Sequence, residues 1–130
     1  MAEEAAGGQA LPRQERLRSA DVQAVFRHAR SRVERATLVA VWRPQPGRAR
    51  VGFAVGRKIG GAVERNRARR RLREAYRRFA KRQATGFDVV FVGRAPLLTC
   101  SFAELAKDMG YAVAALARSV NGGASRALAR

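Results

Sequence analysis

The chain has 130 residues, of which 47% are hydrophobic, and this composition suits one globular domain with a modest core and excludes a wholly disordered chain. Its 27 lysine and arginine residues against 10 acidic ones give a net charge of +17, which favours nucleic acid or an anionic membrane surface as the partner. The single cysteine, Cys100, excludes an intrachain disulfide, and no apolar run approaches the roughly 18 residues of a membrane-spanning helix.

Composition divides the chain into three segments. Residues 1–12 are rich in Ala, Gly and Glu and are predicted to be a disordered extension, residues 13–118 to be a single folded domain, and residues 119–130 to be a flexible tail. The N-terminus has acids where a secretory signal peptide has bases, and no apolar core follows. Together with the single cysteine, this is consistent with a reducing compartment, and a cytoplasmic location is expected.

The first predicted helix begins at Ser19, which is a favourable N-cap residue. Apolar side chains then recur at helical spacing at Val22, Val25, Phe26 and Ala29.

Two β-prone runs follow, "TLVAVWR" at 37–43 and "RVGFAVG" at 50–56. Two prolines and a glycine separate them, so we predict a hairpin with a long loop. In the second run large apolar residues alternate with glycine and alanine, which leaves one face nearly bare and allows a helix or a ligand to approach closely.

The rest of the chain alternates helix and strand. A pair of glycines precedes a long predicted helix at about 62–84, and the continuous apolar run 87–93 predicts a strand that is covered on both faces. Because a helix separates this strand from 50–56, the three form a β-α-β unit and parallel pairing is predicted. The sequence "SFAE" at 101–104 is a capping box that begins the last helix.

The long helix has an apolar face and a basic face. At about 100° per residue, the apolar stripe comprises Ala68, Leu72, Ala75, Tyr76 and Phe79. The remaining arc comprises Arg67, Arg70, Arg71, Arg73, Arg77, Arg78, Lys81 and Arg82. A solvated charged face is the plainer interpretation, but such faces mix signs, and residues 65–82 contain ten bases and one acid. Positive charge in the first turns also opposes the helix dipole, at roughly 0.3–1 kcal/mol per charge. These arginines are therefore candidates for binding a polyanion.

The segment "RVGFAVGRKIGGAVERNRARRRLREAY" at 50–76 resembles the protein subunit of bacterial ribonuclease P. The signature of that family is a strand that ends in paired bases, followed by Gly, Ala-Val, Arg-Asn-Arg, further bases and Arg-Glu. The matching positions are Arg50, Gly52, Lys58, Gly60, Ala62, Val63, Arg65, Asn66, Arg67, Arg70, Arg73 and Glu74. Weaker similarity extends from about Leu17 to Leu116.

The resemblance implies an α+β fold of the ribosomal protein S5 domain 2 type, with a single-layer four-stranded sheet and the element order α-β-β-β-α-β-α. It also implies a left-handed β-α-β crossover, against the usual right-handed preference. The fourth strand would be a short one near residues 31–35.

The resemblance also implies a function, that of the protein subunit of ribonuclease P. Such a subunit is an RNA-binding protein that assists the endonucleolytic removal of the 5′ leader from precursor tRNA. Catalysis is carried by a large RNA, and magnesium ions are held mainly by that RNA. The expected partners are the catalytic RNA and precursor tRNA, with no small-molecule substrate and no membrane. In agreement, the carboxylates show no metal-like cluster and His28 lies off the apolar face of its helix, so no catalytic or metal-binding residue is assigned to the chain.

Two sets of site residues follow from the resemblance. Contact with the catalytic RNA is assigned to Arg57, Lys58, Arg65, Asn66, Arg67, Arg69, Arg70 and Arg73. The leader is expected in a cleft between the first helix and the sheet, lined by Arg16, Arg18, Val22, Phe26, Ala40, Phe53 and Arg94. Val22 and Ala40 stand where the family often has aromatic residues that stack on bases, so leader contacts are expected to depend more on charge.

Two other interpretations stay open at this point. A structural RNA-binding protein, similar to a ribosomal protein, fits the composition but not the pattern at 50–76. A basic amphipathic helix on an anionic membrane would need a free apolar face, whereas Tyr76 and Phe79 are expected in a core. A liposome flotation assay would separate these two interpretations.

Overall fold

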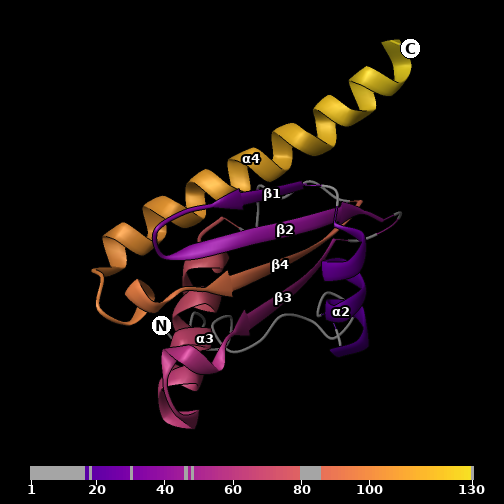
Figure 1. The fold of residues 1–130 in the computed structure, drawn as a ribbon. Coiled ribbons are helices and arrows are strands. Elements are labelled where there is room, and N and C mark those ends of the chain that lie inside the picture. Colours follow the sequence, from indigo (N-terminus) through magenta and orange to yellow (C-terminus); the bar gives the residue numbers. More distant parts are fainter. Residues whose placement is uncertain are drawn as a thin grey trace, which may run out of the picture.

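The computed structural model describes residues 17, 19–29, 31–45, 47, 49–79 and 86–129. A single four-stranded sheet carries one helix on one face and two helices on the other (Figure 1). The strands are β1 Ser31–Glu34, β2 Leu38–Pro44, β3 Arg50–Val55 and β4 Phe87–Gly93. The helices are α2 Ser19–His28, α3 Ala62–Arg77 and α4 Phe102–Ala129, with short 3-10 turns η2 at Arg57–Ile59 and η4 at Ala95–Leu98.

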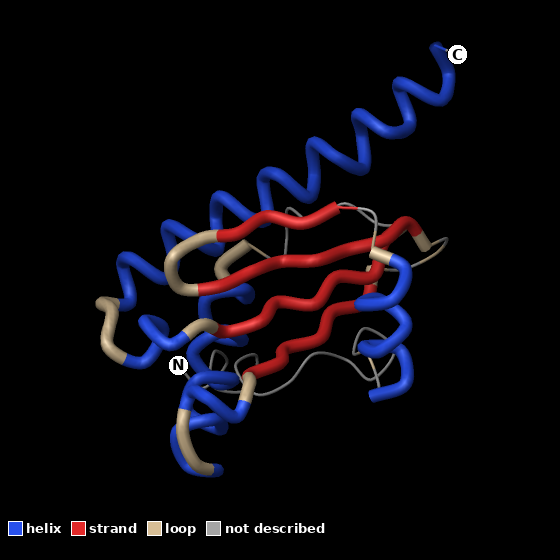
Figure 2. The backbone as a smooth tube through the Cα atoms, in the orientation of Figure 1, coloured by secondary structure: helices blue, strands red, loops and turns tan. Residues whose placement is uncertain are grey.

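The strand order in the sheet is β1-β2-β4-β3 (Figure 2). β4 pairs antiparallel with β2 and parallel with β3, so the predicted parallel β-α-β pairing is confirmed. The short fourth strand is confirmed as β1. The predicted hairpin between β2 and β3 is wrong, because β4 lies between them. The reason is burial: residues 87–91 are all buried, and a central strand is the position that covers both faces.

The larger part of the core lies between the sheet and the pair α3 and α4. The predicted apolar stripe of α3 is confirmed, since Ala68, Leu72 and Ala75 are fully buried and Tyr76 nearly so. From α4 the buried apolar residues are Leu105, Met109, Ala112, Val113 and Leu116. The two helices therefore cover the sheet face that carries the large side chains of β2, β3 and β4.

The opposite face of the sheet is covered by α2 alone. Val25 of α2 is fully buried and packs with Val41 and Val90, and Val22 is partly buried beside them. Gly52 allows this approach, because a Cβ there would lie 3.2 Å from Val22 Cγ2. The prediction of a bare strand face that a helix can approach is thus confirmed.

The last helix begins at the predicted capping box. The Glu104 N–H donates to Ser101 Oγ at 3.1 Å, and the Ser101 N–H donates to Glu104 Oε1 at 3.2 Å. The helix then runs to Ala129, through most of the segment for which a flexible tail is predicted, and Figure 1 shows its last turns extending past the sheet. The N-terminal extension and the end of the predicted 62–84 helix lie outside the described residues. None of the described helices is long and apolar enough to cross a membrane.

Candidate nucleic-acid interface

A sharp turn places the start of α3 at one end of the sheet. β3 leads into η2, and Gly60 then adopts φ 151°, a conformation that L side chains rarely adopt. Its N–H donates to Arg57 O at 3.2 Å, which closes the turn. Gly61 is the N-cap residue of α3 and provides no side-chain cap. The first N–H groups of α3 therefore have no side-chain cap, and the acid of the first turn is Glu64.

The assigned RNA-binding residues surround this turn and the first half of α3. Arg57, Lys58, Asn66, Arg67 and Arg70 are exposed, and Arg65, Arg69 and Arg73 are half-buried. We call these eight residues the basic surface. Two of its members are oriented locally: Arg65 Nη1 donates to Gly60 O at 3.1 Å, and Arg69 Nη2 donates to Asn66 Oδ1.

Carboxylates neutralise arginines elsewhere in the protein but not on the most exposed part of the basic surface. Arg43 and Arg50 pair with Asp88, and Arg35 pairs with Asp108. Among the described residues, no carboxylate lies within ion-pair distance of the exposed bases of the basic surface, which are Arg57, Lys58, Arg67 and Arg70. Within the described part of the chain, these four side chains therefore present positive charge to the solvent without a carboxylate partner.

Two arginines of the predicted basic arc contact neighbouring parts of the protein. Arg71 Nη2 donates to Cys100 O at 2.9 Å, and the guanidinium of Arg78 lies 4.6 Å from the ring centroid of Phe102. Both contacts hold α3 against the segment that leads into α4. Arg71 is half-buried, so the expectation that it faces solvent or RNA is corrected, whereas Arg78 is exposed as expected and contacts Phe102 only at the protein surface.

A second surface lies on the α2 face of the sheet. Val39, Val92 and Ala54 are register partners in one row across β2, β4 and β3, and all three remain partly exposed. The next row, toward α2, is covered. We call the three residues the open row. Arg94 lies at the same end of the sheet, where its Nη1 is 3.9 Å from Glu34 Oε1 and donates to Arg35 O at 3.3 Å.

The predicted leader cleft is only partly assembled as expected. Val22 and Phe26 lie on α2, with Phe26 44% exposed, and Arg94 is exposed at the sheet end. Arg16 and Arg18 lie outside the described residues. His28 is exposed, as predicted.

The placement of Ala40 and Phe53 in a cleft beside α2 is corrected. Ala40 is fully buried in the core on the opposite face, and Phe53 packs there against Tyr76 and Phe91, with ring centroids 5.8 and 6.0 Å apart. Strand alternation explains the difference, because Ala40 points the same way as Trp42, which a core must bury. The same alternation would have identified Val39 as an α2-face residue.

Comparison with known proteins gives a consistent result. A family model described as Ribonuclease P matches residues 11–117. A Ribonuclease P protein component from Symbiobacterium thermophilum is 48% identical over 84 residues, which are 64% of this chain and 73% of the relative. One from Chloroflexus aurantiacus is 49% identical over 61 residues, and there the match spans 46% of this chain and 45% of the relative.

Solved structures agree at the level of the fold. The RNase P protein from Thermotoga maritima is 29% identical with a TM-score of 0.63, covering 72% of this chain and 89% of that one. A Staphylococcus aureus RNase P protein structure has a TM-score of 0.66 at 22% identity, covering 80% of this chain and 95% of that one. At that identity the second likeness supports the fold alone.

Proposed function

The chain belongs to the ribonuclease P protein family, and from that premise we propose that it is the protein subunit of a ribonucleoprotein that removes the 5′ leader from precursor tRNA. In this proposal the protein works in the cytoplasm, where precursor tRNA is processed. Its partners are the catalytic RNA and the precursor tRNA.

The basic surface is proposed to dock the catalytic RNA. The observation that carries this proposal is the exposed, uncompensated charge of Arg57, Lys58, Arg67 and Arg70 around an N-terminus of α3 without a side-chain cap. Stability does not require this arrangement, because positive charge at a helix N-terminus opposes the dipole. Phosphate groups would reverse the cost, since they are attracted both to the guanidinium groups and to the helix N-terminus.

The open row is proposed to form the floor of the groove that holds the single-stranded leader. The row lies between α2 and the sheet end where η2 and Arg94 are found, so a strand bound there would continue toward the basic surface. Its Val and Ala side chains provide apolar contact without stacking, and Phe26 is the exposed aromatic side chain of α2. Arg57 and Arg94 would contact leader phosphates at the rim.

The chemistry is proposed to belong to the RNA. Magnesium ions held mainly by the catalytic RNA would supply the activated water and stabilise the leaving oxygen. The protein would contribute by binding and orienting substrate and RNA, which lowers the magnesium concentration that the holoenzyme needs. No residue of this chain is assigned to a bond-breaking step.

Reconstitution tests this function. The purified protein is mixed with a bacterial ribonuclease P RNA and a precursor tRNA at a magnesium concentration too low for the RNA alone, and leader release is followed on a gel. The expected result is leader release that requires both protein and RNA. Tight, salt-sensitive RNA binding without stimulation of cleavage would instead identify a structural RNA-binding protein.

A further inference from the structure

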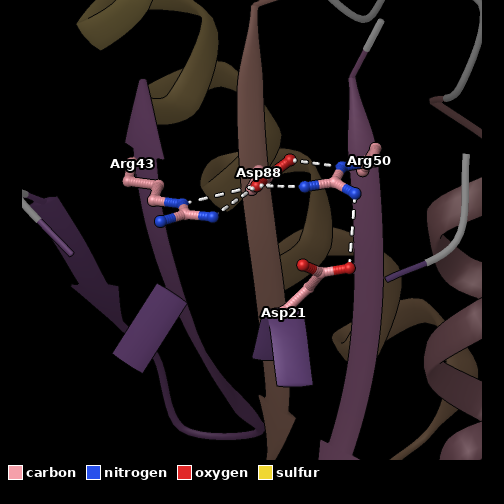
Figure 3. A network of polar contacts seen from close by, with 4 residues as sticks. All are labelled: Asp21, Arg43, Arg50 and Asp88. Carbon is pink, nitrogen blue, oxygen red and sulfur yellow. Dashed lines mark hydrogen bonds and ion pairs between the residues drawn. The ribbon is translucent and has the colours of Figure 1, made fainter. Parts of the chain in front are cut away.

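A row of charged side chains crosses the sheet at the end that α2 covers. Arg43 of β2, Asp88 of β4 and Arg50 of β3 are register partners, and Figure 3 shows the two guanidinium groups meeting at the carboxylate between them. Asp88 is fully buried. Its Oδ1 accepts from Arg50 Nε at 3.0 Å, and its Oδ2 accepts from Arg50 Nη2 at 3.0 Å and from Arg43 at 3.1 and 3.3 Å. Both oxygens of the carboxylate are therefore hydrogen-bonded within the sheet.

The same row reaches α2 through one more contact. Arg50 Nη1 donates to Asp21 Oδ2 at 3.3 Å, and Asp21 lies in the first turn of α2, where a negative charge is favourable (Figure 3). The hydrogen bond to Asp88 raises the pKa of Arg50, so this guanidinium stays charged. Arg50 thus connects a rigid position in the sheet with the start of the helix.

Aliphatic packing also joins α2 to the sheet. Val22 and Val25 pack against Val41 and Val90, and such contacts stabilise the helix without fixing its direction. The Asp21–Arg50 pair is partly exposed, with 32% of the Asp21 side chain and 28% of the Arg50 side chain accessible, so it adds little stability, but its hydrogen bond has a defined direction. The Asp21–Arg50 contact is therefore suited to fix the position of α2 along the sheet, and that position determines which rows of the sheet are covered.

We propose that Asp21 is a positioning residue for substrate binding: through Arg50 it holds α2 over the charged row, and this keeps the open row accessible to the leader. The inference rests on the proposed function, since it concerns the groove assigned there to the leader. Leader binding would then also depend on a polar contact outside the groove, on the side of α2 that lies away from the open row.

The test uses Asp21→Asn in the reconstituted holoenzyme. This variant removes the charge of the Asp21–Arg50 contact, leaves at most a weaker hydrogen bond to the amide oxygen, and keeps all four hydrogen bonds of Asp88 in place. The expected result is an increase in KM for precursor tRNA of about two- to five-fold, as for loss of one partly exposed ion pair. The value of kcat and the affinity for catalytic RNA should not change. The direction of the change in KM is informative, because removing a negative charge would by itself tighten RNA binding and so lower KM.

Two further variants control for charge and for chemistry. Glu104→Gln makes the same charge change at an exposed residue of α4. It keeps the capping box, since a Gln side chain can also accept the hydrogen bond from the Ser101 N–H. It should leave KM unchanged. Asp21→Glu retains a carboxylate and should keep KM near the wild-type value. A KM for Asp21→Asn equal to that of Glu104→Gln would overturn the proposal.

Hydrogen exchange on the free protein separates this inference from the proposed function. The amides of α2 should exchange faster in Asp21→Asn, while those of α3 and α4 stay unchanged; unchanged exchange in α2 would overturn the anchoring role. Equal binding of precursor tRNA and leaderless tRNA by the wild-type holoenzyme would contradict the proposed leader groove. The proposed effect of Asp21 on that groove would then be contradicted as well. Exchange still reports whether Asp21 anchors α2.

Discussion

The carboxylate of Asp108 on α4 accepts two hydrogen bonds from Thr37, one from its hydroxyl at 2.7 Å and one from its backbone N–H at 3.1 Å. Arg35 Nε donates to the other carboxylate oxygen at 3.2 Å. These contacts tie the β1–β2 connection to the second turn of α4. Asp108 is 7% exposed, so the contacts lie in a largely dry environment.

This arrangement predicts a loss of stability in acid. Burial acts to raise the pKa of Asp108, but the hydrogen bonds from Thr37 and Arg35 outweigh it and lower the pKa below the ordinary 3.8. A lowered pKa in the folded state means that the contribution is complete above the unfolded value and is lost as pH falls through the folded one. Asp108→Asn should therefore destabilise the protein by about 2–4 kcal/mol at pH 7, and the difference from wild type should shrink below about pH 4. Urea unfolding at several pH values measures this. A difference that does not depend on pH would contradict the account.

A close packing contact at the end of β4 predicts a destabilising glycine substitution. A Cβ at Gly93 would lie 2.7 Å from Leu97 Cδ2 and 3.5 Å from Leu72 Cδ1, and both leucines are fully buried. Gly93→Ala should therefore cost about 1–3 kcal/mol. Gly56→Ala is the matched control, because nothing lies within 4 Å of a Cβ there and its backbone is extended. It should be neutral or slightly stabilising. Thermal unfolding of both variants measures the difference. Equal melting temperatures would contradict the prediction, because they would show that Leu97 and Leu72 move aside at no cost.

The two exposed aromatic side chains of α2 and α4 provide a test of the leader groove. Phe26 is 44% exposed on α2, beside the open row's face of the sheet, and Tyr111 is 49% exposed on α4. Phe26→Ala should weaken binding of precursor tRNA by up to the ~1–3 kcal/mol of one base stack. Leaderless tRNA should bind this variant as it binds wild type. Tyr111→Ala should change neither affinity, and equal losses for the two variants would argue against a groove beside α2.

The local elements of this fold could be predicted from the sequence, whereas their pairing could not. Ser101 and Glu104 define a helix start by themselves, and the stripe from Ala68 to Tyr76 defines a buried helix face, because both signals depend on residues a few positions apart. Which strand lies beside β2 depends on competition for the centre of the sheet. β4 occupies the position beside β2, and this pairing of strands distant in sequence cannot be predicted from segments that are adjacent in the chain.

The site shows the same division. The basic surface was predictable because its charge and its family signature are continuous in sequence. The open row was missed because Val39, Ala54 and Val92 come from three strands and become neighbours only through the register of the sheet. The family pattern predicts Ala40 on the α2 face, whereas strand alternation with Trp42 predicts the core face on which both residues lie.

The charge of the basic surface makes the most direct test of the account, through the salt dependence of binding to a bacterial ribonuclease P RNA. Arg67 and Arg118 are both exposed arginines, one on the basic surface and one on α4. Each is replaced by Ala, which lowers the net charge equally. The account predicts that Arg67→Ala weakens binding and reduces the slope of log affinity against log salt by about 0.7–0.9, the value of one phosphate contact. Arg118→Ala should keep the wild-type slope. Equal slopes for the two variants would contradict the docking of RNA on α3.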